Sequence, residues 1–440
     1  MNSNIINVIL IKKCYQKRDS YEGCGKYSVR FEKITYAWEQ RKLSEICERI
    51  TRKNRNNESD LPLTIASQFG LIDQRDFFNK VVAAKDMSNY YLLKKGEFAY
   101  NKSYSNGFDY GSIKRLNAYK QGCLSTLYIC FGITSDEVES DYLECFFDTL
   151  KWYGDLSMIC AEGARNHGLL NVDTKGFFDE VTVDLPKSLE EQKRISVYMN
   201  ALNRLITLHQ RKCDETKQLK KFMLQKMFPK NGEKNPEIRF EGFTDDWEQR
   251  KLSELTTMHA RIGWQNLRTS EFLDSGDYML ITGTDFQEGV IDYSTCHYVE
   301  KERYDQDKNI QIKNGSILIT KDGTLGKVAY VQGLMMPATL NAGVFNVTIK
   351  NENIMDGKYL FQYLKAPFLM DYVSKKATGG TIKHLNQSIL VDFPVAMPKR
   401  EEQVKISRYF TALDNLITLH QRKCEKLKEL KKYMLHNMFV

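Results

Sequence analysis

The chain has 440 residues, enough for two or three domains with buried cores. It carries 64 Lys and Arg against 56 Asp and Glu, and the net charge of +8 permits binding to a polyanion without requiring it. It has ten cysteines but no zinc-like spacing, and no apolar stretch long enough to span a membrane. We therefore expect a cytoplasmic protein with free thiols and no metal site.

Residues 1–28 open the chain with a short apolar run at 5–11. This run lacks the charge order and the cleavage site of a secretory signal. The 28 residues match no other part of the sequence. We expect them to form a poorly ordered N-terminal extension.

A tandem duplication begins at Val29. The sequence VRFEKITYAWEQRKLSEI at 29–46 returns as IRFEGFTDDWEQRKLSEL at 238–255. Near the ends of the copies, residues 191–229 match 402–440 with 24 identities in 39 positions. The stretches of sequence between these repeated segments do not match in any obvious way. The pattern predicts one frame, built twice, that carries two different bodies.

The first body, 29–187, combines strand and helix patterns. Strand-like runs occur at 97–100 and 124–131, and a helical stretch occurs at 141–151. A body of this size and mixture is typical of an independent α+β domain.

A long helix follows at 188–228. Apolar residues recur at steps of three and four from Ile195 to Met227, with no Pro or Gly among them. A helix of this length extends about 55 Å. Its apolar stripe is narrow, so it needs a partner helix, which the second copy supplies at 400–440. We expect the lysines and arginines of the outer face to be solvated rather than bound to phosphate.

The second copy repeats this plan after a linker at 229–237 that is rich in Pro, Gly, Asn and charge. Its body, 238–399, has strand-like runs at 316–320 and 327–331 and a helical stretch at 357–365. We therefore predict an α+β fold in which two globular domains alternate with two long antiparallel coiled-coil helices, related by a pseudo-twofold axis.

One loop in each body could contact a polyanion. In the second body, KDGTLGK at 321–327 lies between two strands, and its glycines allow close backbone approach while its lysines can meet phosphates. An ordinary Asp-Gly hairpin turn explains the same residues. The first body has a longer, more aromatic loop at 102–111, which leads into Lys114 and Arg115. The candidate contacts in these loops are Lys102, Tyr104, Lys114, Arg115, Lys321, Thr324 and Lys327.

A second pair of segments lies at 161–171 and 377–386. Each contains glycines, one basic residue (Arg165 or Lys383), a histidine and an asparagine. Arg and Asn can contact base edges or phosphate, so Arg165 and Lys383 join the candidate contacts. We expect the histidines to be structural rather than catalytic.

Catalytic motifs were not found. The sequence has no phosphate-binding P-loop, no nucleophile elbow, and no tetrapeptide of the adenine methyltransferases. Asp184, Glu191 and Lys193 have nuclease-like spacing, but the second copy has Val404 in place of Lys193, so we interpret the spacing as chance.

The repeated WEQRKLSE and LITLHQRKC words, with unlike bodies between them, resemble the specificity subunit of type I restriction–modification systems. The resemblance covers nearly all of 29–440. It implies that 29–187 and 238–399 are target-recognition domains and that the helices are spacers. It further implies a non-catalytic DNA-binding chain without cofactors of its own. Two methyltransferase subunits would bring S-adenosylmethionine, and two translocase–endonuclease subunits would bring ATP and Mg.

If the resemblance holds, the two unlike bodies should read the two halves of an asymmetric, bipartite DNA target. Helices of this length suit half-sites about 34 Å apart, near one turn of DNA. A coiled-coil scaffold whose bodies bind proteins is the alternative, and a stand-alone nuclease would need carboxylates that we do not find.

Overall fold

The computed structural model describes residues 38–439 except for 67–69, 79–82, 104–106, 161–164, 167–168, 231, 263–265 and 377–384. The chain forms two compact units. Unit 1 contains the described residues up to Ile206 together with 425–439, and unit 2 contains Thr207–Cys424. Each unit therefore combines one body with parts of both long helices.

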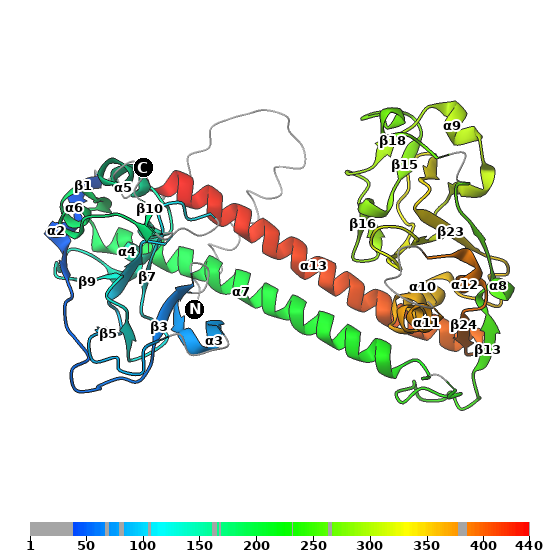
Figure 1. Ribbon diagram of the computed structural model, residues 1–440, viewed down its shortest axis with the longest axis horizontal. Helices are drawn as coiled ribbons and strands as arrows, with labels where there is room; N and C mark the ends of the chain where they lie inside the picture. Colours follow the sequence, from blue (N-terminus) through cyan, green and yellow to red (C-terminus); the bar gives the residue numbers. More distant parts are fainter. Residues whose placement is uncertain are drawn as a thin grey trace. The chain divides into compact units, whose positions relative to one another are not determined.

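The long helices are α7, Leu189–Lys226, and α13, Arg400–Met438 (Figure 1). Each begins with a pair of glutamates, which favour the positive end of the helix dipole. Within unit 2 the two helices run antiparallel, because Cys213 Sγ contacts the carbonyl of Ile417 and Lys220 Nζ lies 2.6 Å from Asp414 Oδ1.

Two equivalent histidines of the copies face each other in unit 2, with 2.9 Å between Nδ1 of His209 and Nδ1 of His420. Burial, followed by the charge of His420, lowers the pKa of His209. The unfolded chain therefore binds more protons below its ordinary pKa of about 6.5, and stability should fall as the pH drops through that value. We expect the melting-temperature difference between wild type and His209→Gln to shrink between pH 7.5 and 5.5. His436→Gln, at an exposed position, should show no such trend.

Each unit contains a four-stranded antiparallel sheet with the same strand order. In unit 1 the order is β2 (Cys47–Arg49), β9 (Ile129–Ile133), β6 (Phe98–Asn101) and β7 (Ser112–Arg115). In unit 2 it is β14 (Thr256–His259), β23 (Val344–Ile349), β20 (Ile317–Thr320) and β21 (Val328–Tyr330). The two bodies thus retain one topology although their sequences diverged.

Smaller sheets enclose a second apolar cluster in each unit. Unit 1 has the pairs β3 (Leu63–Ala66) with β4 (Gly70–Asp73) and β5 (Tyr91–Lys94) with β8 (Gln121–Leu124). Unit 2 has the sheet β18 (His297–Tyr298), β15 (Met279–Ile281), β22 (Ala338–Leu340) and β19 (Gln311–Ile312), and the hairpin β16 (Phe286–Gln287) with β17 (Val290–Ile291). The short helices α3 (Gln74–Phe78) and α9 (Lys301–Asp305) complete this layer.

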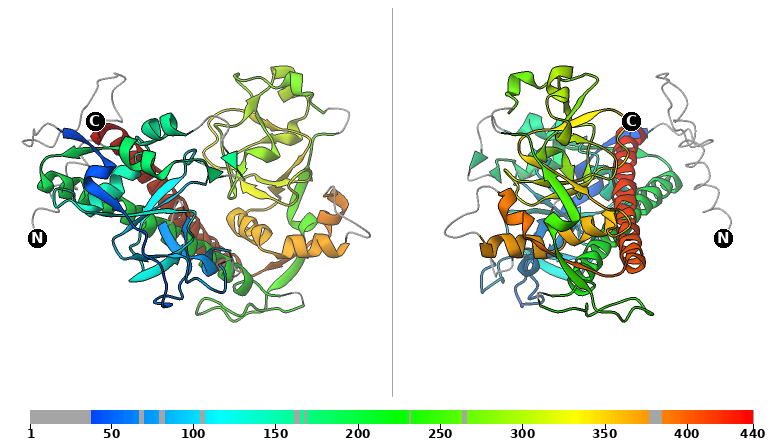
Figure 2. Two further views of the ribbon diagram at one scale, coloured as in Figure 1. Left: turned by 60° about the vertical axis from the view of Figure 1, so that its left-hand side comes forward. Right: turned by 90° about the vertical axis from the view of Figure 1, so that its right-hand side faces the viewer.

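Three short helices of each body join the long helices in the main core of its unit, and those of unit 2 are drawn in orange in Figure 2. They are α4 (Ser140–Phe147), α5 (Tyr153–Ile159) and α6 (Thr174–Glu180) in unit 1, and α10 (Gly357–Lys365), α11 (Phe368–Lys376) and α12 (Gln387–Val391) in unit 2. The helix predicted at 357–365 is present, whereas the one predicted at 141–151 ends at Phe147 because Leu150 takes a positive φ of 62°. The run 124–131 is not one strand, since a turn separates β8 from β9.

The repeated WEQRKLSE word forms the same element in both units. It supplies β1 (Trp38–Lys42) and α2 (Leu43–Ile46) in unit 1, with β1 paired to β12 (Thr182–Pro186). It supplies β13 (Glu248–Lys251) and α8 (Leu252–Leu255) in unit 2, with β13 paired to β24 (Pro394–Met397). Each strand pair leads directly into the long helix that follows it.

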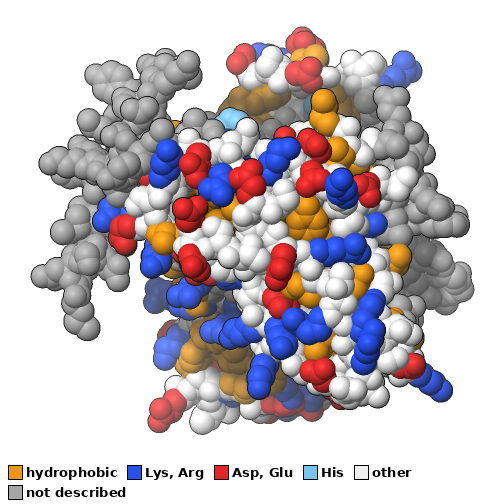
Figure 3. All heavy atoms as spheres, turned by 90° about the vertical axis from the view of Figure 1, so that its left-hand side faces the viewer, with side chains coloured by type: hydrophobic (Ala, Val, Ile, Leu, Met, Phe, Trp, Pro, Cys, Tyr) orange, Lys and Arg blue, Asp and Glu red, His pale blue; other side chains and the backbone are white. Residues whose placement is uncertain are grey.

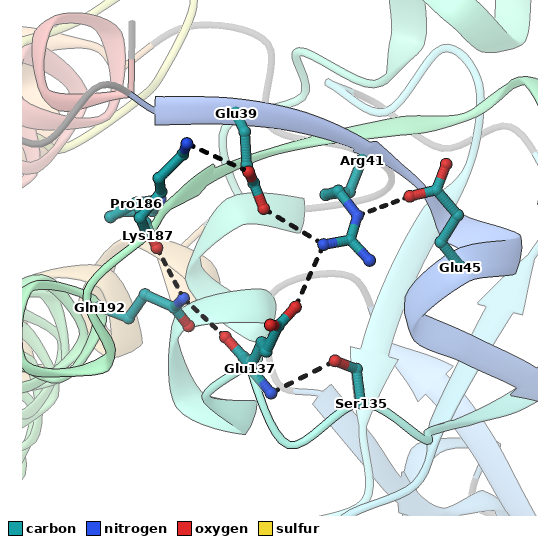
Figure 4. A network of polar contacts seen from close by, with 8 residues as sticks. All are labelled: Glu39, Arg41, Glu45, Ser135, Glu137, Pro186, Lys187 and Gln192. Carbon is teal, nitrogen blue, oxygen red and sulfur yellow. Dashed lines mark hydrogen bonds and ion pairs between the residues drawn. The ribbon is translucent and has the colours of Figure 1, made fainter.

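A buried glutamine fixes each of these junctions. In unit 1, Gln192 donates to the carbonyls of Glu137 and Pro186, both at 2.9 Å (Figure 4), and accepts from the Glu139 N–H at 2.8 Å. In unit 2, Gln403 makes the equivalent three bonds, to the carbonyls of Ile354 and Pro398 and from the N–H of Asp356. The repeated segments therefore have similar sequences because each of them forms the same strand-to-helix junction.

Beside the unit 1 junction, Arg41 bridges Glu39, Glu45 and Glu137 at the rim of a cavity of about 160 Å³ (Figure 4). The hydrogen bonds that Arg41 donates to Glu45, Glu39 and Glu137 raise the pKa of its guanidinium. In unit 2, Arg250 pairs with Glu248.

An aromatic socket in each unit holds the end of a long helix. In unit 1, Phe439 packs edge-on against Trp38 at 6.1 Å and beside Tyr142 at 5.6 Å. In unit 2, Phe228 meets Trp247 and Tyr359 at 6.4 and 5.7 Å. Each body thus receives the end of the helix that belongs to the other copy.

Candidate nucleic-acid interface

The loops singled out by the sequence occupy one position in the shared topology. The loop at 102–111 joins β6 to β7, and the loop at 321–327 joins β20 to β21. Both strand pairs form the same edge of the four-stranded sheet. The frame therefore presents a short basic loop in unit 2 and a longer aromatic loop in unit 1 at equivalent places.

Thr320 fixes the loop at 321–327 through two hydrogen bonds of its side chain. Its hydroxyl donates to the carbonyl of Thr324 and accepts from the N–H of Lys327 at 2.9 Å. Gly323 takes a positive φ of 71°, and a Cβ there would meet no atom within 4 Å, so its backbone is open to close approach. Thr324 and Lys327 are exposed, and Lys321 is half-buried with Nζ 5.6 Å from the centre of the Phe345 ring.

The loop at 102–111 closes against its own strands. Gly111 has a positive φ of 80°, and a Cβ there would lie 2.0 Å from the carbonyl oxygen of Asn101, so only glycine fits. The hydroxyl of Tyr100 donates to the carbonyl of Tyr110 at 2.8 Å. Lys102 is half-buried, and Tyr104 lies outside the described residues.

The second pair of segments meets the hairpin loops in both units. The N–H of Leu170 donates to the carbonyl of Lys102 at 3.0 Å, and the N–H of Leu385 donates to the carbonyl of Lys321 at 2.9 Å. In unit 1 the segment forms a small hairpin of β10 (Arg165–Asn166) and β11 (Leu169–Leu170). In each unit, therefore, the described residues of the two predicted segments are joined by a backbone hydrogen bond.

Many residues of the segments 161–171 and 377–386 lie outside the described residues. Arg165 lies in β10, but its side chain is outside the described residues. Lys383, His384 and His167 also lie outside them.

Two of the predicted DNA contacts in unit 1, Lys114 and Arg115, form ion pairs with acidic residues of the same unit. Lys114 lies 2.7 Å from Asp148, which also binds Lys431 of α13 at 3.0 Å. Burial alone would raise the pKa of Asp148, but the two lysines lower it overall. Arg115 is paired with Asp141 and Glu144, and only 12% of its side chain is exposed. These contacts favour a structural role for Lys114 and Arg115.

Sequence reasoning missed a cavity of about 260 Å³ in unit 2, which includes His259, Lys350 and Gln387 in its lining. Gln387 Nε2 donates to the carbonyl of Met258 at 3.0 Å. The position of Gln387 directly after Asn386 was the available signal in the sequence. The other lining residues belong to α8, β14, the residue after β23 and α12, which are distant in sequence.

No catalytic arrangement was found in the parts of the chain that the structure describes. Asp184 contacts Lys151 at 4.0 Å, and Glu191 accepts from Trp38 Nε1 at 3.3 Å, so both carboxylates hold the junction. No three His, Cys, Asp or Glu side chains of the described ranges gather as a metal site. No described helix is long and apolar enough to cross a membrane. The face in Figure 3 shows acidic and basic side chains interspersed.

Each unit therefore carries an unlike loop at the same position of one shared sheet topology. Residues 244–429 match the family model of the type I restriction modification DNA specificity domain. The second copy and its helix are therefore similar to the type I DNA specificity domain, and this match confirms the resemblance for that part of the chain.

Sequence relatives support this relationship. The chain is 24% identical over 280 residues to the MjaVIII specificity subunit of Methanocaldococcus jannaschii, which covers 62% of this chain and 64% of that protein. It is 26% identical over 151 residues to the EcoR124I/EcoR124II specificity subunit of Escherichia coli, covering 34% and 37%. The chain thus matches less than two-thirds of the length of these relatives.

Solved structures share the fold over almost the whole chain. The S subunit of the type I restriction–modification system of M. genitalium has a TM-score of 0.59 and 12% identity, with 93% of this chain and 97% of that one covered. A chain from a structural study of assembly and conformational transition in the type I R-M system has a TM-score of 0.52 and 17% identity, with 92% and 98% covered.

Proposed function

We propose that this chain is the non-catalytic DNA-reading subunit of a type I restriction–modification complex. The observation that carries the proposal is the placement of two chemically different loops at one point of a duplicated frame. Each body would read one half of an asymmetric bipartite DNA target, because unlike loops favour unlike half-sites. Phosphate contacts would set the register, and base-edge contacts would give the sequence. The chain would act in the cytoplasm, where it meets DNA.

We propose that DNA is contacted by residues of the hairpin loop and of the second predicted segment of each body. In unit 2 they are Lys321, Thr324, Lys327 and Lys383. In unit 1 they are Lys102, Tyr104 and Arg165, while the ion pairs of Lys114 and Arg115 favour their structural role.

We further propose that the repeated parts dock two copies of one methyltransferase subunit. Leucines at equivalent positions of the helices are 38–45% exposed, namely Leu205, Leu208, Leu416 and Leu419. Exposed apolar residues that recur in both copies suit a partner that binds twice. Two translocase–endonuclease subunits would complete the restriction complex. S-adenosylmethionine, ATP and Mg would be bound by these partner subunits.

The alternative is a scaffold whose bodies bind proteins. It explains the helices but not the match of residues 244–429 to a DNA specificity domain. Salt dependence separates the two hypotheses. A DNA reader should lose affinity steeply between 50 and 200 mM salt, as phosphate contacts release counterions.

Lys321→Ala tests the basic loop of unit 2. If Lys321 meets a phosphate, the variant should bind DNA more weakly and reduce the slope of log affinity against log salt by about one. Lys308→Ala, an exposed lysine elsewhere in unit 2, is the matched control and should leave the slope unchanged. An unchanged slope for Lys321→Ala would remove this loop from the interface.

The target itself is tested by mapping methylated adenines in cells that express the chain with its methyltransferase. We expect two unlike half-sites with an unread spacer. Inserting four residues after Leu208, about one helical turn, should change the spacer and leave both half-sites intact. An unchanged spacer in an active complex would contradict the role of the helices.

A further inference from the structure

In unit 2 the loop at 321–327 packs against the helix α11. Gly326 of the loop takes a positive φ of 71°, and a Cβ built there would overlap Sδ of Met370, so glycine is required for two reasons. Met370 lies in the first turn of α11. Its side chain therefore contacts the backbone of the loop directly, and any movement of Met370 is felt by the loop.

Unit 1 has the corresponding contact with different chemistry. The hydroxyl of Tyr153, the first residue of α5, donates to the carbonyl of Gly111 at the end of the loop 102–111. The ring of Tyr153 lies 5.4 Å from that of Tyr110 and 4.7 Å from that of Trp152. Burial raises the pKa of Tyr153, so its hydroxyl remains a proton donor.

Both contacts come from the helix that leads into the second predicted segment. The helix α5 ends at Ile159, just before 161–171, and α11 ends at Lys376, just before 377–386. After each helix the chain returns to the same hairpin loop through the backbone hydrogen bond of Leu170 or Leu385. The hairpin loop of each unit is therefore fixed at two points, once by a side chain of the helix and once by backbone.

We propose that Met370 and Tyr153 are positioning residues for sequence recognition, each holding the hairpin loop of its own body in the conformation that reads one half-site. This role rests on the proposed function of the chain. A displaced loop moves its donors and acceptors out of register with the base edges, even though the supporting side chain itself does not contact DNA. The loss should therefore fall on discrimination between sequences rather than on phosphate contacts.

DNA binding by the complex of the full chain with its methyltransferase tests this role. The probes are a duplex with the mapped methylation motif and two duplexes in which one half-site is scrambled. Met370→Ala should reduce the preference for one half-site by roughly tenfold, within the cost of one mismatched base pair, and Tyr153→Phe should do so for the other half-site. Neither change removes a charge, so both variants should keep the wild-type slope of log affinity against log salt.

Matched controls separate positioning from stability. Tyr142→Phe also removes a hydroxyl that donates to a backbone carbonyl of unit 1, that of Asp184, but at the junction with α7. Met355→Ala removes a buried methionine from the core of unit 2. Both controls should lower the melting temperature and leave both half-site preferences intact. Met370→Leu keeps an apolar side chain of similar volume and should retain the preference that Met370→Ala loses.

Three results would overturn the assignment of these positioning residues. They are wild-type preferences in Met370→Ala and Tyr153→Phe, a loss at the same half-site in both variants, and an equal loss of preference in the two controls. A wild-type complex that prefers neither half-site would instead contradict the proposed function, on which the roles of Met370 and Tyr153 depend.

Discussion

Phe439→Ala should lower the free energy of unfolding of unit 1 by about 3–5 kcal/mol, the cost typical of removing a buried aromatic ring. Phe439 is fully buried, and its ring contacts Trp38, Tyr142 and Phe146. Since these partners come from β1 and from α4, two elements that are far apart in sequence, the cavity cannot close by a small local shift. Calorimetry should show a drop of roughly 10 °C in the unit 1 transition.

The chain offers a matched test of this socket. Phe228→Ala removes the equivalent ring and should lower the unit 2 transition by a similar amount, with little effect on unit 1. Phe222→Ala, at a ring that is 48% exposed, should change stability by less than about 0.5 kcal/mol. If Phe439→Ala left the unit 1 transition unchanged, the end of α13 would not be part of that unit.

Asp148→Asn should also destabilise unit 1, by about 3–5 kcal/mol, because two lysines would lose the carboxylate that neutralises them. The side chains of Lys114 and Lys431 are 13% and 22% exposed, so water can replace the carboxylate only in part. Urea unfolding measures the loss. Since the pKa of Asp148 is lowered in the folded state, this stabilisation should be present above about pH 4 and decline as the pH falls further.

Lys114→Met separates structure from DNA contact at the same site. If the ion pair is the function of Lys114, the variant should unfold more easily but keep the wild-type slope of log DNA affinity against log salt. Lys95→Met, at an exposed position in unit 1, is the control and should change neither property. A slope reduced by about one for Lys114→Met would return this lysine to the interface.

The two long helices and the junctions that precede them were predictable from the sequence, because the duplication repeats their sequences almost unchanged. The helix period from Ile195 to Met227 and the repeated Trp38 and Trp247 words located α7, α13 and both junctions. The strand at 316–320 and the helix at 357–365 were also predictable, since their apolar patterns are continuous. The apparent strand at 124–131 was wrong because its apolar residues belong to two strands, and local pattern does not show the turn between them.

The candidate site was predictable only in part. Spacing located the loops at 102–111 and 321–327, but it could not show that Leu170 and Leu385 bind the loop carbonyls, since these contacts join distant segments. It also could not show that Lys114 faces Asp148. A lysine near a glycine-rich loop has the same local sequence whether it contacts phosphate or a carboxylate of its own domain.

The assignment of the last turns of α13 to unit 1 has a consequence for the order of folding. A ribosome that has made residue 206 must add about 230 more residues before Phe439, which fills the Trp38 socket, exists, and this takes roughly 10–50 s at ordinary elongation rates. During that interval unit 1 has an open aromatic pocket, whereas every segment of unit 2 follows within one continuous stretch. Unit 2 can therefore complete first, whereas unit 1 lacks the end of α13 until synthesis has almost reached residue 439.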